Sequence, residues 1–151
     1  MPTAYSEQLN VPLRWWAQAT MLLATFWWAF IVSIPEWIAW SGTGVLVALT
    51  FGLFGWIGSS KIEVGDGVLR VGPAHIDLVH VGQVEALDKE GTRRVHGPQA
   101  DARAFLHTRP YISRAVRIAI EDPADPTPYW LVSTRHPEGL ASALTTLTRN
   151  D

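Results

Sequence analysis

Two stretches of the sequence contain no charged side chain: residues 15–35, WWAQATMLLATFWWAFIVSIP, and residues 37–60, WIAWSGTGVLVALTFGLFGWIGSS. A helix needs roughly 20 predominantly apolar residues to cross a hydrocarbon core about 30 Å thick, and both stretches are long enough. Pro35 marks a break between two helices, because proline lacks an amide hydrogen and disfavours helix at the preceding residue. The sequence therefore predicts two transmembrane helices, over residues 13–34 and 37–58, joined as a hairpin.

The distribution of residue types divides the chain near residue 60. Seven of the eight Trp lie in the first 60 residues, whereas 23 of the 26 charged residues lie in residues 61–151. A buried hairpin in a soluble protein would need more partner surface than the remaining residues offer, and a cleaved signal peptide would not be followed at once by a second apolar stretch.

The lack of Cys excludes a disulfide-stapled module, and a net charge of −2 argues against a nucleic-acid partner.

The orientation of the hairpin follows from its flanking charges. Arg14 precedes the first helix, Lys61 and Arg70 follow the second, and the corner between them carries only Glu36. Because basic residues favour the cytoplasmic side, we expect both termini in the cytoplasm, with residues 1–12 as a cytoplasmic N-terminal segment.

Small residues recur every four positions on the second helix, at Gly44, Ala48 and Gly52. Such a stripe allows another helix to approach closely. Two interpretations remain open: packing against the first helix, or contact with a partner helix or a second copy of the chain. Neither helix carries an ionisable residue in its interior, which argues against a transporter or pump.

Residues 61–151 are predicted to form a small cytoplasmic antiparallel β domain. A hairpin turns at Gly65-Asp66-Gly67, further strands are expected over residues 75–81, 83–87 and 116–121, and Tyr129–Ser133 is rich in strand formers. Between residues 91 and 110 only a short strand at 103–108 is indicated. An amphipathic helix over residues 137–148 closes the chain, so the fold class is an α+β membrane protein.

Titratable residues give no catalytic or metal signature. Five His are scattered along the domain, without paired Cys or a close carboxylate set. The hydroxyls of Ser133 and Thr134 lie near His136 in sequence, but hydroxyls before a helix usually bond its amides. Asp122 and Asp125 precede prolines, where Asp shapes turns. We therefore expect no catalytic residue, no metal and no cofactor.

Two further surfaces are candidates for binding. Seven Arg are spread over residues 93–135, and a dispersed solvated surface is the plainer interpretation, since 12 acidic residues accompany the 11 basic ones in residues 61–151. Near anionic lipid each basic residue contributes about 1 kcal/mol, and we assign that role to the four residues Arg93, Arg94, Arg114 and Arg117. The rigid proline-rich turn is expected to present a partner-binding set: Asp125, Tyr129, Trp130 and Arg135.

The whole chain resembles a family of actinobacterial membrane proteins of unknown function. The resemblance rests on Tyr5-Ser6-Glu7, on Val11-Pro12 with Trp15-Trp16, and on residues 122–135, DPADPTPYWLVSTR. The ending Val132–Glu138 also resembles the strand, Ser-Thr turn and helix start of bacterial pleckstrin-homology-like (PH-like) domains. The resemblance implies a two-span topology and a PH-like barrel, and it implies no activity.

We therefore expect a non-enzymatic, membrane-anchored module that presents its PH-like domain to a membrane-protein partner or to anionic lipid head groups. The alternative is an accessory subunit of a larger membrane enzyme or cell-envelope complex. A homo-oligomer is compatible with either function.

Overall fold

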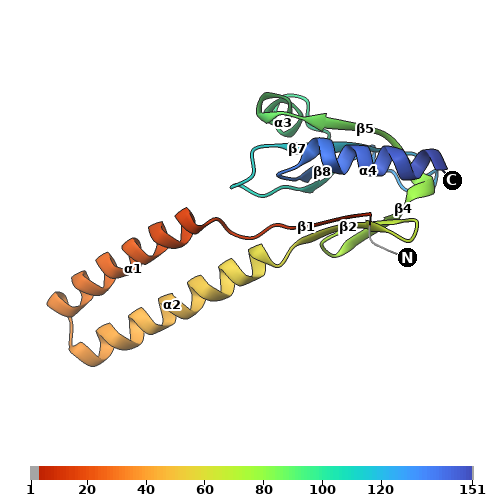
Figure 1. Ribbon diagram of the computed structural model, residues 1–151. Helices are drawn as coiled ribbons and strands as arrows, with labels where there is room; N and C mark the ends of the chain where they lie inside the picture. The colour runs from red at the N-terminus through yellow and green to blue at the C-terminus, as the bar shows by residue number, and fades with distance from the viewer. Residues whose placement is uncertain (1–3, 151) are drawn as a thin grey trace. The chain divides into compact units, whose positions relative to one another are not determined.

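The computed structural model describes residues 4–150 and divides into two compact units (Figure 1). The helical unit is Asn10–Ser60, and the sheet unit combines the residues before Asn10 with those after Ser60. This division confirms the predicted α+β layout of two long apolar helices, antiparallel strands and a C-terminal helix.

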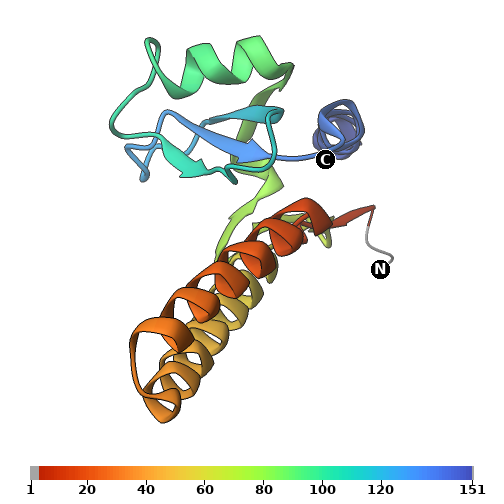
Figure 2. The same ribbon diagram turned by 90° about the vertical axis from the view of Figure 1, so that its left-hand side faces the viewer.

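The helical unit consists of α1 (Leu13–Ser33) and α2 (Glu36–Gly58), which lie side by side in both views (Figures 1 and 2). Pro35 precedes the first turn of α2. Backbone amides there have no partner within the helix, so the missing amide hydrogen of proline costs no helical hydrogen bond. Both helices are long and apolar enough to cross a membrane. Many of their large apolar residues lie on the outer surface of the helix pair: the exposed fraction is 68% for Trp28, 74% for Trp37 and 76% for Trp56.

Aromatic contacts join α1 to α2. The ring of Trp16 meets Phe51 and Phe54 edge-on, at centroid distances of 5.0 and 4.9 Å. Farther along, the rings of Trp27 and Trp40 are 5.7 Å apart. Edge-to-face and tilted aromatic pairs are favourable because the positive ring edge meets a negative ring face.

The first sheet of the sheet unit is antiparallel throughout, in the order β1-β2-β3-β4. Its strands are β1 (Tyr5–Gln8), β2 (Lys61–Gly65), β3 (Val68–Val71) and β4 (Ala74–Asp77). The predicted hairpin is confirmed, since both Asp66 and Gly67 at the β2–β3 turn have positive φ, the conformation that Asp-Gly favours. The strand predicted over residues 75–81 is interrupted, because Leu78–His80 form a 3-10 turn.

The second sheet has the order β5-β7-β8-β6. Its strands are β5 (Val81–Leu87), β6 (Phe105–His107), β7 (Ala115–Ile120) and β8 (Tyr129–Ser133). Strand β6 pairs in parallel with β8, whereas the other pairs are antiparallel. The strands therefore form two four-stranded sheets rather than one closed barrel.

Strand β1 was not predicted, since residues 1–12 were expected to form a separate N-terminal segment. It pairs antiparallel with β2, and Gln8 lies opposite Lys61. The segment is short and its alternation is weak, so only pairing with β2 reveals it. The helical hairpin is consequently an insertion between two neighbouring strands of one sheet.

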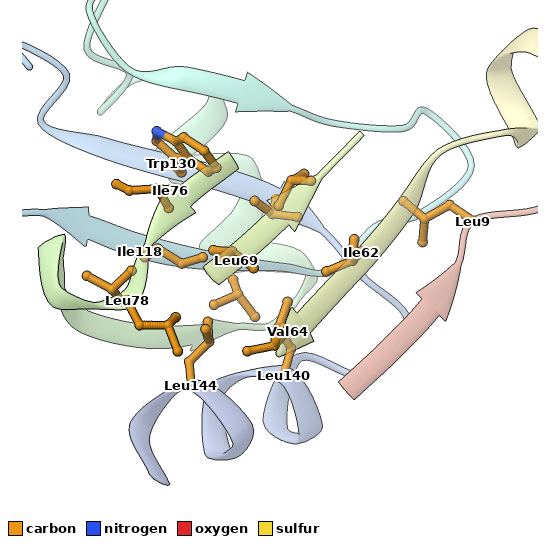
Figure 3. Packing of buried hydrophobic residues seen from close by; sticks show 14 of the residues in the cluster. Leu9, Ile62, Val64, Leu69, Ile76, Leu78, Ile118, Trp130, Leu140 and Leu144 are labelled. Atoms are coloured by element: carbon orange, nitrogen blue, oxygen red, sulfur yellow. The ribbon is translucent and has the colours of Figure 1, made fainter. Parts of the chain in front are cut away.

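One hydrophobic core joins the two sheets and α4 (Pro137–Asn150). In Figure 3, Leu140 and Leu144 project from α4 toward Val64 and Leu78 of the first sheet and its following turn. Trp130 and Ile118 complete the same core from the second sheet. A smaller cluster on the opposite face of the second sheet packs Leu87, Ala115, Tyr129 and Leu131 against Val95 of α3 (Lys89–His96).

The carboxylate of Glu7 fastens β1 to the connection between β8 and α4. It accepts hydrogen bonds from the Tyr5 hydroxyl at 2.7 Å, from the Thr134 hydroxyl, and from the Arg135 amide at 2.9 Å. Burial, together with the neighbouring carboxylate, raises the pKa of Tyr5 to about 12, so its phenol keeps the donated proton at neutral pH. The stretches around Glu7 and Thr134, both quoted for the family resemblance, therefore meet in space.

Replacing Glu7 by Ala should destabilise the sheet unit by at least about 2 kcal/mol, because hydrogen bonds to a charged group are each worth about 1.5–3 kcal/mol. The free energy of unfolding of the full chain in nonionic detergent measures this loss. Ser6→Ala, on the exposed face of the same strand, is the control and should change the free energy by less than about 0.5 kcal/mol. Equal effects of both variants would show that the Glu7 bonds do not hold β1.

Candidate functional site

The partner-binding set predicted on the proline-rich turn is only partly accessible. The side chains of Tyr129 and Trp130 are 4% and 6% exposed, so the prediction that they face a partner is wrong. The reason is that β8 is covered on both faces: Trp130 enters the core shared with α4, and Tyr129 packs toward α3. The Tyr129 hydroxyl also accepts a hydrogen bond from the Asp101 amide at 3.1 Å.

Asp125 and Arg135 have local structural roles. The Asp125 carboxylate accepts a bond from the Thr127 amide at 2.9 Å, and bonding to Thr127 lowers the pKa of that carboxyl. The Asp122 carboxylate likewise accepts a hydrogen bond from the Ala124 amide, at 2.8 Å. Arg135 is half-buried, and its amide donates to Glu7. These contacts account for the turn and leave its use as a binding surface a prediction.

The four Arg assigned to lipid lie on different elements. Arg93 and Arg94 are exposed on α3, and Arg114 is exposed just before β7. The guanidinium of Arg117 lies over the ring of Tyr129, 4.6 Å from its centroid. Arg93 also lines a hollow together with other basic residues.

That hollow, the α3 cleft, has a volume of about 500 Å³ and lies between α3 and the loop that links β6 to β7. Its lining residues are Lys89, Thr92, Arg93, His96, Gly97, Thr108, Arg109, Pro110, Ile112, Ser113 and Ser133. One Lys, two Arg and one His line the cleft, and none of these lining residues is acidic. The arrangement therefore favours an anion.

The spacing of residues on α3 places its basic side chains on one face. Lys89, Arg93 and His96 recur at intervals of four and three, whereas Gly91 and Val95 are buried on the sheet side. The Asp88 carboxylate caps the start of the helix by accepting a hydrogen bond from the Gly91 amide at 2.6 Å. Helix α3 was not predicted because it is short and polar, although Asp88 before it and the basic residues at its end are ordinary helix signals.

The opposite wall is held in place by bonds to the sheet. The Arg109 amide donates to the buried Ser133 hydroxyl at 3.0 Å, and the Tyr111 hydroxyl donates to the Leu9 carbonyl at 2.8 Å. Thr108 Oγ1 and His96 Nε2 lie 3.5 Å apart, at the limit of hydrogen bonding, between the loop and the end of α3. On α3 itself, the buried hydroxyl oxygen of Thr92 has no hydrogen-bond partner within the described residues.

The small-residue stripe of α2 does not face α1. Apart from its chain neighbours and the backbone of its own helix, a Cβ placed on Gly44 or Gly52 would meet no atom of the described residues within 4 Å, and Ala48 is exposed. The interpretation that Gly44, Ala48 and Gly52 pack against the first helix is therefore wrong. Ala39, which is fully buried, and Gly42, near Phe30, lie on the side that meets α1.

His107 is the buried histidine of the sheet unit. Burial and, secondarily, the positive charge of Arg109 lower the pKa of its imidazole. Its ring lies close to Gly72, where a Cβ would approach within 2.9 Å and where φ is +58°. The described residues contain no group of three or more His, Asp or Glu side chains placed to hold a metal ion.

The lowered pKa of His107 predicts a loss of stability in acid. The pKa of a His in an unfolded chain is about 6.5. Below that pH the unfolded chain binds a proton at this position that the folded chain does not yet bind, so protonation favours unfolding. The thermal midpoint of the full chain in detergent should fall between pH 7.5 and pH 5, and His107→Gln should remove part of that fall. His75→Gln, on the exposed side of β4, is the control and should retain the full fall. An unchanged fall in His107→Gln would contradict the assignment.

Comparison with known proteins places the chain in a family. It matches the family described as "Protein of unknown function (DUF3093)" over residues 4–144. No curated protein and no solved structure matches the chain. The predicted membership of a family of unknown function is confirmed, and the matched range includes both apolar helices, both sheets and the α3 cleft.

Proposed function

The chain belongs to the DUF3093 family, and we propose that it is a membrane-anchored, non-enzymatic interaction module. In this proposal α1 and α2 span the cytoplasmic membrane of an actinobacterium, and both termini lie in the cytoplasm. The sheet unit, a variant of the PH-like architecture, then contacts anionic lipid head groups or a membrane-protein partner.

The observation that carries the proposal is the exposed apolar surface of the helical unit. In the most apolar part of α1 no residue is buried, and in the most apolar part of α2 only 6% of the residues are buried. A soluble protein rarely leaves so large a continuous apolar surface in water, whereas lipid tails would cover it without cost. The basic residues Arg14 and Lys61 flank the pair on the side of the sheet connections, as the positive-inside rule requires of a cytoplasmic side.

Alkaline carbonate washing of bacterial membranes tests the anchoring. The full chain should stay in the membrane fraction, and Leu22→Arg combined with Leu49→Arg should move most of it out of that fraction. Each of these Leu is exposed near the middle of its helix, where a charge costs about 2.5–3.5 kcal/mol. The matched control replaces both Leu by Ile and should stay in the membrane. Quantitative release of the unaltered chain would contradict the proposal.

A second candidate function is that of an accessory subunit in a larger membrane complex. It is favoured by the uncovered stripe of Gly44, Ala48 and Gly52, which α1 leaves open. In lipid, small residues promote helix association because backbones can pack closely. The proposal of an accessory subunit therefore places a foreign helix on this side of α2.

Adding bulk to the stripe tests the second candidate. Gly44→Leu combined with Ala48→Leu should shift the chain from a large detergent-stable complex to a smaller species on native gels. Ala29→Leu, on the exposed surface of α1, is the control and should leave the complex intact. A complex of unchanged size in the double variant would exclude this surface as the contact.

A further inference from the structure

We propose that the α3 cleft binds a phosphate group carried by a small organic molecule or by a lipid. This inference deepens the proposed function, and its lipid alternative rests on the contact with head groups proposed there. All the lining residues belong to the sheet unit, so the site does not require α1 and α2 to span a membrane. A phosphate ester and a phospholipid head group share the chemistry that the cleft would recognise.

The charge of the lining indicates a ligand with more than one negative charge. Lys89 and Arg93 approach from α3, and Arg109 approaches from the opposite loop. Arginine presents a planar fork of donors that matches phosphate oxygens, and lysine adds a mobile point charge. Lys89 and Arg93 lie four positions apart on α3, so their side chains are neighbours on one face of the helix and can meet the same anion.

Hydroxyl groups supply the remaining donors of the site. Thr92 lines the cleft, and its hydroxyl oxygen is buried without a hydrogen-bond partner within residues 4–150. A buried hydroxyl without a partner is costly, and a turn of the Thr92 side chain toward the cleft would let this hydroxyl donate to a phosphate oxygen. Thr108 and Ser113 offer two more hydroxyls from the loop.

The size and the apolar part of the cleft indicate what carries the phosphate. A volume of about 500 Å³ falls in the range of small-molecule sites and exceeds what a bare phosphate ion needs. Pro110 and Ile112 contribute apolar surface on the loop side. The cleft therefore suits a phosphate ester whose organic part contacts these two residues.

Loop geometry makes the site prearranged rather than formed on binding. The bond from the Arg109 amide to Ser133, at 3.0 Å, ties the loop to the end of β8. A second bond, from the Ile112 amide to the Arg109 carbonyl at 3.0 Å, closes the turn itself. A rigid wall lowers the entropy lost on binding, which is one requirement of a specific site.

Calorimetric titration of the full chain with inorganic phosphate tests the site, in nonionic detergent at low ionic strength. Arg93→Gln should raise the dissociation constant about tenfold, as should Lys89→Gln. Arg94→Gln is the matched control, since it removes the same charge from the next position of α3 outside the cleft, and it should change the constant by less than about twofold. Lys89 and Arg93 are exposed, so neither substitution threatens folding.

Two results would overturn the inference: no measurable phosphate binding by the unaltered chain, or equal weakening by Arg93→Gln and Arg94→Gln. The second would show a diffuse surface charge instead of a site. The Arg93→Gln variant should stay in carbonate-washed membranes, so that a loss of phosphate binding is distinguished from a loss of anchoring.

The source of the phosphate is distinguished by reconstitution into nanodiscs. In discs of phosphatidylcholine alone, the chain should bind inorganic phosphate as it does in detergent. If the natural ligand is a lipid head group, phosphatidic acid in the discs should abolish that binding in the unaltered chain. If the ligand is a soluble phosphate ester, phosphatidic acid should leave it unchanged. Either outcome supports the phosphate site and assigns its source.

Discussion

The pairing of β1 with β2 is the constraint on which the rest of this structure depends. The two strands are neighbours in an antiparallel sheet, yet the whole helical unit lies between them in sequence. Gln8 lies opposite Lys61, so the chain leaves the sheet and returns to it at points only about 4.5–5.5 Å apart. A hairpin of two antiparallel helices meets this requirement, because its ends also lie close together.

The bonds of Glu7 make that pairing part of the core instead of a loose edge. An edge strand of four residues has few ladder bonds, and β1 lies at the edge of its sheet. The Glu7 carboxylate accepts three hydrogen bonds, from Tyr5, Thr134 and Arg135, and the last two tie this edge to the segment that leads into α4. The helical unit is thus connected through β1 and β2 to the same core that supports the second sheet. On the far face of that sheet, α3 forms one wall of the cleft.

Much of the architecture could be predicted from residue patterns. The two apolar stretches, the Asp66-Gly67 turn, the strand at residues 129–133 and the final helix each carry a strong local signal. Strand β1 and helix α3 do not, because one is defined by pairing with residues more than fifty positions away and the other is short and polar.

The site was harder to predict than the fold, since it depends on which faces are covered. Tyr129 and Trp130 resemble binding residues in the sequence, but a second layer on each side of β8 buries them. Arg93 was predicted to bind lipid and lies in the cleft, whereas Lys89 and Arg109, which also line it, were not predicted, because only the folded chain brings their segments together. The stripe on α2 could be identified, but not the fact that α1 leaves it open.

The central claim, that the hairpin inserted between β1 and β2 crosses a membrane and returns to one sheet, is tested most directly by cysteine labelling in intact cells. The chain has no Cys, so single replacements report single positions. Ser33→Cys lies at the end of α1 by the hairpin corner, and Gln99→Cys lies on the exposed surface of the sheet unit. We predict that a membrane-impermeant maleimide labels Ser33→Cys in intact cells and labels Gln99→Cys only after the cells are permeabilised. Equal labelling of both positions in intact cells, or the reverse pattern, would contradict the account.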